Sequence, residues 1–188
     1  AENPKVARML HLPLQSGSTK ILGAMNRGYT KEEFIELALK IKKEIPDIGI
    51  TTDIIVGFPG ETDEDFQDTL DVVEQVGFEN AFMFMYSKRS GTPAAVLEEQ
   101  VPEQVKKERL QQLMRLQNAR AKEESKKYYG QTLKVLVEGP SSKNPDMLTG
   151  RTSTHKIVLF KGYEELSVKF KNVKIYETKT WTLYGELV

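Results

Sequence analysis

The hydrophobic period of this 188-residue chain changes once, near Gly130, and this change limits what the chain can fold into. Before Gly130, short apolar runs alternate with segments whose apolar residues recur every three or four positions. This alternation predicts strands and helices in turn, an order that builds parallel sheets or barrels with working loops at the carboxyl ends of the strands. After Gly130, apolar residues recur at every second position, which is typical of a small β-barrel.

Helix start signals organise the first part of the chain. Thr30 and Glu33, and again Thr62 and Asp65, have the spacing of a capping box, and Ser18 can cap a third, shorter helix. Apolar runs predict three strands, at 6–12, 48–58 and 81–86. Three parallel strands cannot close a barrel, so this part is expected to be a fragment of a larger α/β unit. Its open edge and apolar interior should allow the isolated chain to associate with itself.

These patterns divide the chain into three parts. Residues 1–98 form the α/β part, residues 99–129 a connecting helix, and residues 130–188 an all-β part. The strands expected in the last part are at 133–137, 157–160, 166–170, 173–176 and 181–188. Five strands in about sixty residues suit an OB-like barrel, an architecture often used to bind oligonucleotides.

Composition excludes several kinds of chemistry. The chain has no cysteine, so its own residues can form no disulfide, zinc ribbon or cysteine-bound iron-sulfur cluster. It shows neither a membrane span nor a signal peptide, so we expect a cytoplasmic protein. Residues 1–102 carry 10 basic and 17 acidic side chains, whereas residues 103–188 carry 17 basic and 10 acidic ones. This split predicts a polyanionic partner for the second half, although solvated helix faces would explain it equally well.

Four strings of residues resemble one known family. They lie at 11–18, 25–30, 52–62 and 86–95. The first three resemble the second half of the radical S-adenosylmethionine (SAM) core of methylthiotransferases, and the fourth is similar to the segment after its last barrel strand. Residues 130–188 resemble the TRAM domain of that family, an RNA-binding barrel. The resemblance predicts the C-terminal part of such an enzyme, a partial (β/α) radical SAM barrel followed by an OB-like TRAM barrel.

The resemblance also implies an activity. Residues 15–18 favour the tRNA-modifying members, and residues 150–158 are similar to the TRAM segment of the MiaB branch. Enzymes of that branch add a methylthio group to isopentenyladenosine beside the tRNA anticodon, using SAM and two 4Fe-4S clusters. The implied partners are tRNA and the missing N-terminal part of the same enzyme, which would supply the cluster cysteines. The alternatives are a threonylcarbamoyl-adenosine tRNA or ribosomal-protein substrate, or a stand-alone RNA-binding module.

Candidate residues for the SAM or substrate site begin in the first of these strings. Gln15, Ser16, Gly17 and Ser18 lie between a predicted strand and a helix, where hydroxyl and free N–H groups can meet a ligand. Capping of the helix by Ser18 is the simpler alternative. Asp53 lies within an apolar strand, so its carboxylate should have a partner, either a ligand hydroxyl or a basic side chain.

Two further candidates, Gly57 and Arg89, follow predicted strands. Gly57 lies in a stretch that resembles the SAM-adenine strand, but the family pattern G-x-I-x-G-x-x-E is altered there. Asp53 replaces the first glycine and Glu61 comes one residue late, so Glu61 is expected to stabilise the first turn of the next helix instead. Arg89 is expected to hold a SAM carboxylate or a tRNA phosphate, with a surface salt bridge as the alternative.

Basic residues of the TRAM-like part are candidates for RNA binding. Arg151, Lys156 and Lys161 flank the segment that carries the resemblance, and Phe160 and Tyr163 are close to them in sequence. Cationic and aromatic side chains together suit contacts with RNA phosphates and bases, although the aromatic residues could equally belong to the core.

The absence of cysteine gives a first testable prediction. We propose no metal ligand in this chain, so reconstitution with iron and sulfide should give no stable four-iron cluster and no SAM cleavage. Iron analysis and anaerobic turnover measure both quantities. Stoichiometric iron with charge-transfer absorption would contradict the prediction.

Overall fold

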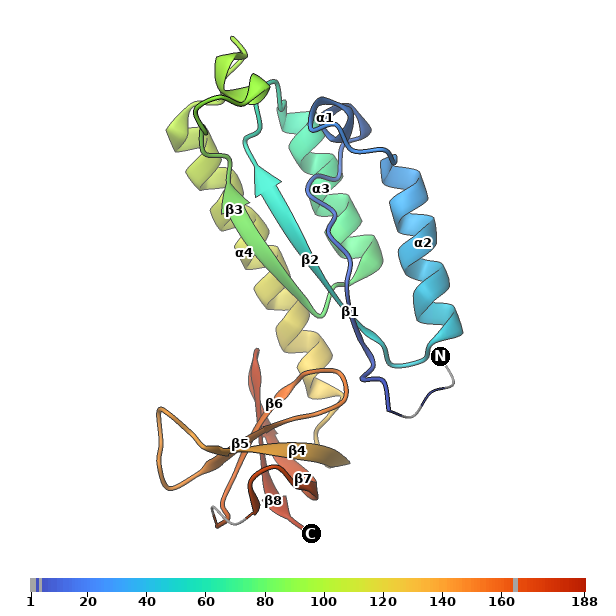
Figure 1. Cartoon of the computed structure of the whole chain (residues 1–188), viewed down its shortest axis with the longest axis vertical. Coiled ribbons are helices and arrows are strands. Elements are labelled where there is room, and N and C mark those ends of the chain that lie inside the picture. Colours follow the sequence, from blue (N-terminus) through green and yellow to red (C-terminus); the bar gives the residue numbers. More distant parts are fainter. Residues whose placement is uncertain (1–2, 4, 164–165) are drawn as a thin grey trace. The chain divides into compact units, whose positions relative to one another are not determined.

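The computed structural model describes residue 3, residues 5–163 and residues 166–188, in two compact units (Figure 1). The first unit comprises Leu10–Pro46 and Ile50–Asn118. The second comprises Ala119–Val188, Asp47–Gly49 and the start of the chain to Met9.

The first unit is built on a three-stranded sheet with the order β1-β2-β3. The strands are β1 (Met9–His11), β2 (Gly49–Val56) and β3 (Asn80–Met85). Strand β2 lies in the middle and pairs in parallel with β3, from Thr51 opposite Asn80 to Val56 opposite Met85. The pairing with the first segment continues beyond β1, where Gln15 forms a parallel bridge with Ile54. The three expected strands are confirmed, although β1 is shorter than predicted.

Three helices in the first unit begin at the expected caps, and a fourth, short helix was not expected. They are α1 (Thr19–Ala24), α2 (Lys31–Glu44), α3 (Asp63–Val76) and a 3-10 helix, η1 (Pro93–Val96). Thr30 and Thr62 each complete a capping box, and the Ile21 N–H donates to Ser18 Oγ. Helices α2 and α3 pack against each other beside the sheet (Figure 1).

A long helix, α4 (Glu103–Lys126), lies within the connecting helix expected at 99–129 but is shorter at both ends. The division between the two compact units falls within it, after Asn118. None of the helices that the structure describes is long and apolar enough to cross a membrane.

The second unit contains a closed five-stranded barrel with the order β4-β5-β6-β8-β7. The strands are β4 (Thr132–Pro140), β5 (Leu148–Arg151), β6 (Ile157–Phe160), β7 (Phe170–Thr178) and β8 (Thr182–Leu187). Its pairs are antiparallel except β6 with β8, which is parallel. Its core includes the fully buried side chains of Val135, Val158, Phe160 and Leu183. The expected small all-β barrel is therefore confirmed.

The period-two pattern is wrong at two places in this barrel. Residues 166–169 form a turn rather than a strand, and Val168 has a φ of 60° there. Strand β5 was not expected, because its sequence Leu-Thr-Gly-Arg shows no apolar alternation. Gly150 is required in β5, since a Cβ atom would lie 2.5 Å from Val135 Cγ1 and 2.6 Å from the Leu136 carbonyl oxygen. A glycine placed by close packing has no hydrophobic signal for a sequence pattern to detect.

Asp65 joins α1 to the start of α3. Its carboxylate accepts hydrogen bonds from Ser18 Oγ at 2.6 Å, Lys20 Nζ at 2.8 Å and the Thr62 N–H at 2.9 Å. Burial alone would raise the pKa of Asp65, but the hydrogen bonds from Lys20, Ser18 and Thr62 outweigh it and lower the pKa to about 2. The ionised carboxylate is thus the form that stabilises this corner.

This pKa predicts how stability depends on pH. Because the folded pKa lies below the ordinary value of 3.8, Asp65 stabilises the fold above pH 4 and loses this effect as pH falls towards 2. Asp65→Asn should lower the free energy of unfolding at pH 7 by roughly 1–2 kcal/mol and flatten the acid dependence. Urea unfolding followed by helical circular dichroism measures both, with Glu64→Gln, an exposed acid of the same helix turn, as control. Equal acid dependence in parent and Asp65→Asn would contradict this account.

Candidate functional site

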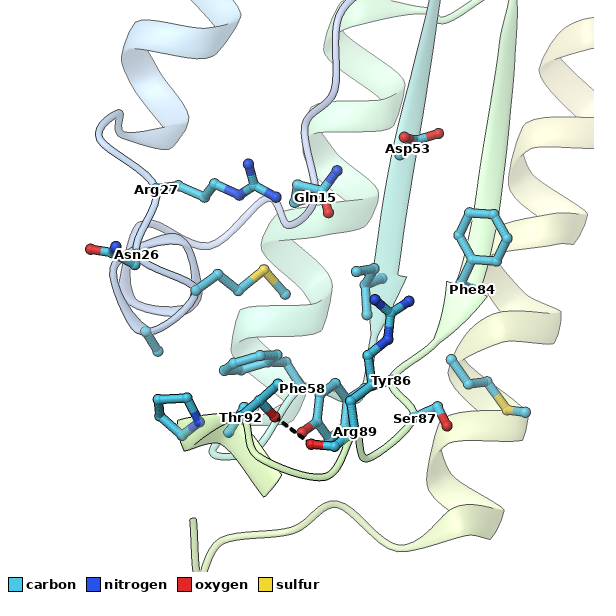
Figure 2. Close-up of a pocket in the computed structure, with 16 residues that line it drawn as sticks. Gln15, Asn26, Arg27, Asp53, Phe58, Phe84, Tyr86, Ser87, Arg89 and Thr92 are labelled. Carbon is cyan, nitrogen blue, oxygen red and sulfur yellow. Dashed lines mark hydrogen bonds between the residues drawn. The ribbon is translucent and has the colours of Figure 1, made fainter. Parts of the chain in front are cut away.

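A pocket of about 900 Å³ opens in the first unit at the carboxyl ends of β2 and β3 (Figure 2). Its walls come from these two strands, the loop after β1, the turn after α1 and the segment that follows β3. Folds with parallel strands place their binding sites at this end of the sheet. The pocket is therefore the candidate active-site region of the chain.

Two arginines line this pocket from different segments. Arg27 belongs to the turn after α1, and Arg89 follows β3. Neither guanidinium forms a hydrogen bond or an ion pair with another residue in the described part of the chain. Figure 2 shows the Arg27 side chain extending towards Gln15, which also lines the pocket. Two guanidinium groups without a partner among the described residues can bind the carboxylate or phosphate of a ligand in this pocket.

Asp53 is the carboxylate of the pocket. His11 Nε2 lies 3.4 Å from Asp53 Oδ2, and His11 Nδ1 lies 2.9 Å from Thr51 Oγ1. The His11 ring also packs edge-on against Phe82, with 6.1 Å between the ring centroids. His11 is therefore a basic partner of the kind expected for Asp53. The Asp53 side chain is still 33% exposed, which leaves it accessible to a ligand hydroxyl or ammonium group.

Arg27 lines the pocket but is not among the site residues predicted from the sequence. The preceding residue, Asn26, has a left-handed φ of 57°, a conformation that asparagine tolerates at the end of a helix. The Tyr29 hydroxyl donates to the carbonyl oxygens of Pro13 and Leu14 at 3.0 and 3.1 Å, which anchors the turn to the loop after β1. The Asn-Arg-Gly sequence after a predicted helix is the signal that could have identified this position.

Three of the four candidates in the loop after β1 do not line the pocket. Gln15 faces it, whereas Ser16, Gly17 and Ser18 are buried in the packing beneath the loop. Ser18 Oγ donates to Asp65, and the Gly17 N–H donates to Thr69 Oγ1 at 2.9 Å. A Cβ atom on Gly17 would lie 2.3 Å from the Thr69 Cα atom, so the loop rests directly on α3. These residues position the loop that carries Gln15.

Gly57 likewise lies outside the pocket lining and has a structural role. Its φ is 73°, and a Cβ atom there would lie 2.1 Å from Lys106 Cγ. The Gly57 N–H donates to Glu61 Oε1 at 2.8 Å, and Arg109 Nη1 donates to the same oxygen at 2.7 Å. Burial raises the pKa of Glu61, while these two donors oppose the rise. The first-turn role expected for Glu61 is wrong, because α3 begins only at Asp63.

The first turns of α4 hold the ends of β2 and β3 together. Arg109 binds the loop after β2 through Glu61, as described above. Lys106, one helical turn earlier, donates from Nζ to the Tyr86 carbonyl oxygen at 3.2 Å. Tyr86 packs edge-on against Phe58 with 5.1 Å between ring centroids, and both residues line the pocket. Helix α4 therefore helps to build the pocket, and these two cations point into the first unit.

The TRAM-like candidates have three different environments. Arg151 Nε donates to Glu138 Oε1 at 2.9 Å, and Arg151 Nη1 lies 3.1 Å from His155 Nδ1. Burial lowers the pKa of His155, and Arg151 lowers it further, so this ring can accept from Arg151 while neutral. Lys156 is only 5% exposed, which removes its ammonium group from the surface. Lys161 is exposed, directly after β6.

Known proteins are similar to both units. Residues 2–73 match the Radical SAM superfamily model, and residues 126–188 match the TRAM domain model. The chain is 61% identical over 188 residues to tRNA-2-methylthio-N(6)-dimethylallyladenosine synthase of Fusobacterium nucleatum. It is 56% identical over 184 residues to the protein of the same name from Acetivibrio thermocellus.

Each alignment covers nearly all of this chain but less than half of the relative. They include 100% and 98% of this chain, but only 43% and 38% of the relatives' own lengths. The chain thus spans about two fifths of the curated relatives it matches. Residues 2–73 therefore belong to the Radical SAM superfamily and residues 126–188 form a TRAM domain, and all 188 residues are similar to part of the Fusobacterium nucleatum protein.

Proposed function

We propose that this chain is part of a tRNA methylthiotransferase that adds a methylthio group to isopentenyladenosine next to the anticodon. In this proposal residues 1–98 supply part of the SAM and substrate barrel, residues 99–129 connect the domains, and residues 130–188 bind tRNA. The observation that carries the proposal is the 61% identity over the whole chain to a relative named for this modification. The cytoplasm, where tRNA is modified, is the compartment that this function implies.

The pocket of the first unit has groups that suit SAM. Gln15, Asp53 and Arg89, together with Arg27, are the residues that we propose to contact SAM or the substrate nucleoside. Guanidinium groups suit the carboxylate of SAM, and the Asp53 carboxylate suits its ammonium or ribose hydroxyl groups. When bound and cleaved at a cluster, SAM would supply the radical. The residues of this chain bind and orient the ligand.

The iron-sulfur clusters of the family do not fit the residues of this chain. The sequence has no cysteine, and the described residues contain no group of three or more His, Asp or Glu side chains placed to hold a metal. In our proposal both 4Fe-4S clusters are held by cysteines in the remaining part of the enzyme. Those cysteines would complete the site at the pocket.

Exposed aromatic side chains on β3 support self-association of the isolated chain. Phe82 and Phe84 are 49% and 54% exposed, and they alternate with less exposed residues along the strand. Within the described residues β3 pairs only with β2, so one of its edges is unpaired. An open edge beside exposed apolar side chains favours pairing between copies.

Activity of the complete reading frame that encodes this chain tests the proposed function. After reconstitution with iron and sulfide, and when supplied with SAM and an electron donor, the encoded protein should methylthiolate isopentenyladenosine in tRNA, as measured by mass spectrometry of digested nucleosides. Asp53→Asn and Arg89→Met should lower the yield by about tenfold or more, because each removes a charged contact to the ligand. Lys143→Ala, in an exposed loop of the barrel, is the control and should retain the parent yield.

Other outcomes would favour the alternatives. A methylthio group on threonylcarbamoyl-adenosine or on a ribosomal protein would keep the reaction and change the substrate. A reading frame without the C-x-x-x-C-x-x-C spacing upstream of this segment, with no product, would contradict the enzyme proposal and favour a stand-alone RNA-binding module.

A further inference from the structure

Strand β7 carries exposed aromatic side chains on the outside of the barrel. Val173 and Ile175 are 0% and 1% exposed, so these residues point into the core and their neighbours point outward. Phe170 is 61% exposed and Tyr176 is 50% exposed. A single exposed aromatic side chain is ordinary in a folded protein, so the groups around these rings decide what they mean.

A cationic side chain lies over Phe170, and further polar side chains follow along β7. Lys134, on the neighbouring strand β4, has its Nζ atom 4.8 Å from the centroid of the Phe170 ring. The strand register places Asn172 opposite Lys134, and Lys174 lies two residues further along β7. Neither lysine forms an ion pair in the parts of the chain that the structure describes, and Glu186, opposite Lys174 on β8, does not reach it. Among the described residues, one ammonium group without an ion pair therefore lies over the Phe170 ring, and a second, that of Lys174, lies further along the same strand.

The strands that usually bind ligands in such a barrel lack an exposed aromatic ring with unpaired cations near it. OB-like barrels commonly bind through their second and third strands, which here are β5 and β6. The outward side chains of these strands are half-buried rather than exposed. They are Thr149, Arg151, Ile157 and Leu159. Arg151 is held by Glu138, and Phe160 is fully buried in the core. Exposed rings with unpaired cations are found instead on β7 and β4.

We infer that the outward side chains Lys134, Phe170, Asn172, Lys174 and Tyr176, which we call the β7 face, bind single-stranded RNA. A base can stack on either exposed ring, the flanking phosphates can meet the two ammonium groups, and the Asn172 amide can bond a base edge. From Phe170 to Tyr176 the strand extends about 20 Å, which is room for several nucleotides. The inference rests on the proposed tRNA-modifying function. It adds which surface contacts the RNA and that the RNA bound there is single-stranded.

The partner is single-stranded because stacking needs the open face of a base. Bases inside a duplex are stacked on each other, and side chains cannot reach their faces. The β7 face should therefore prefer an anticodon-like loop or a free single strand to a blunt duplex of the same sequence. Phosphate attraction alone would give no such preference, since a duplex carries more charge per length.

Affinity of the 188-residue chain for a labelled single-stranded oligoribonucleotide tests the inference. Phe170→Leu keeps an apolar side chain but removes the ring, so the dissociation constant should rise about tenfold without a change in salt dependence. Phe170→Tyr should bind like the parent. Lys134→Ala should weaken binding and reduce the slope of log K against log salt by about 0.7.

Matched controls separate the β7 face from general effects. Tyr163→Leu removes an aromatic ring that is 79% exposed but lies outside β7, and it should bind like the parent. Lys143→Ala removes an exposed cation from the loop between β4 and β5 and should keep the salt slope. Thermal unfolding of the barrel, followed by Trp181 fluorescence, confirms that each variant is folded.

Three outcomes would overturn the inference. If Phe170→Leu and Lys134→Ala bind like the parent while Lys161→Ala weakens binding, the RNA surface lies elsewhere and the proposed function is unaffected. If the blunt duplex binds as tightly as the single strand and Phe170→Leu affects neither, stacking on β7 is wrong. If the chain binds no RNA at low salt, the β7 face and the proposed tRNA-binding role of residues 130–188 both fail.

Discussion

The buried ion pair between Glu61 and Arg109 is the interaction on which the pocket of the first unit depends. Their side chains are 1% and 8% exposed, and Glu61 Oε1 accepts from both Arg109 and the Gly57 N–H. The pair thus attaches α4 to the loop that ends β2 and carries Phe58 into the pocket wall. Burial of a charge pair gives little net stability, but loss of one partner is costly because the other charge stays buried. Its main effect is to fix one arrangement of the loop.

The net charge of the second half overstates the number of cations that it exposes. Arg109 and Lys106 count among the basic residues of that half, yet both point into the first unit and bind backbone or carboxylate oxygens there. Lys156 is buried and Arg151 is held by Glu138. The cations that remain unpaired around the barrel are fewer than the sequence suggests. Exposure and pairing, rather than net charge, therefore select the surface that can meet a polyanion.

Much of the fold could be predicted from the sequence because it depends on local signals. Capping boxes at Thr30 and Thr62 and the apolar run of β2 need only neighbouring residues. Strand β5 and the role of Glu61 could not be predicted, because they depend on contacts distant in sequence, such as Gly150 against Val135 and Glu61 against Arg109.

The candidate site could likewise be predicted only in part. The recognised strings contain Gln15, Asp53 and Arg89, which line the pocket, but also Ser16 and Gly57, which do not. A string that resembles a family does not indicate which of its residues face a ligand and which hold the loop. Only the packing of Gly17 on Thr69, and of Gly57 against Lys106, separates the two roles.

A double-mutant cycle between Glu61 and Arg109 tests most directly whether α4 builds the pocket. Unfolding of the first unit, followed by helical circular dichroism, would give free energies for Glu61→Leu, Arg109→Leu and the double variant. Each single change should cost about 3–5 kcal/mol by leaving a buried charge unpaired, and the double change should cost clearly less than their sum. Hydrogen exchange at the Gly57 amide should rise in all three. Additive costs with unchanged Gly57 exchange would contradict the account.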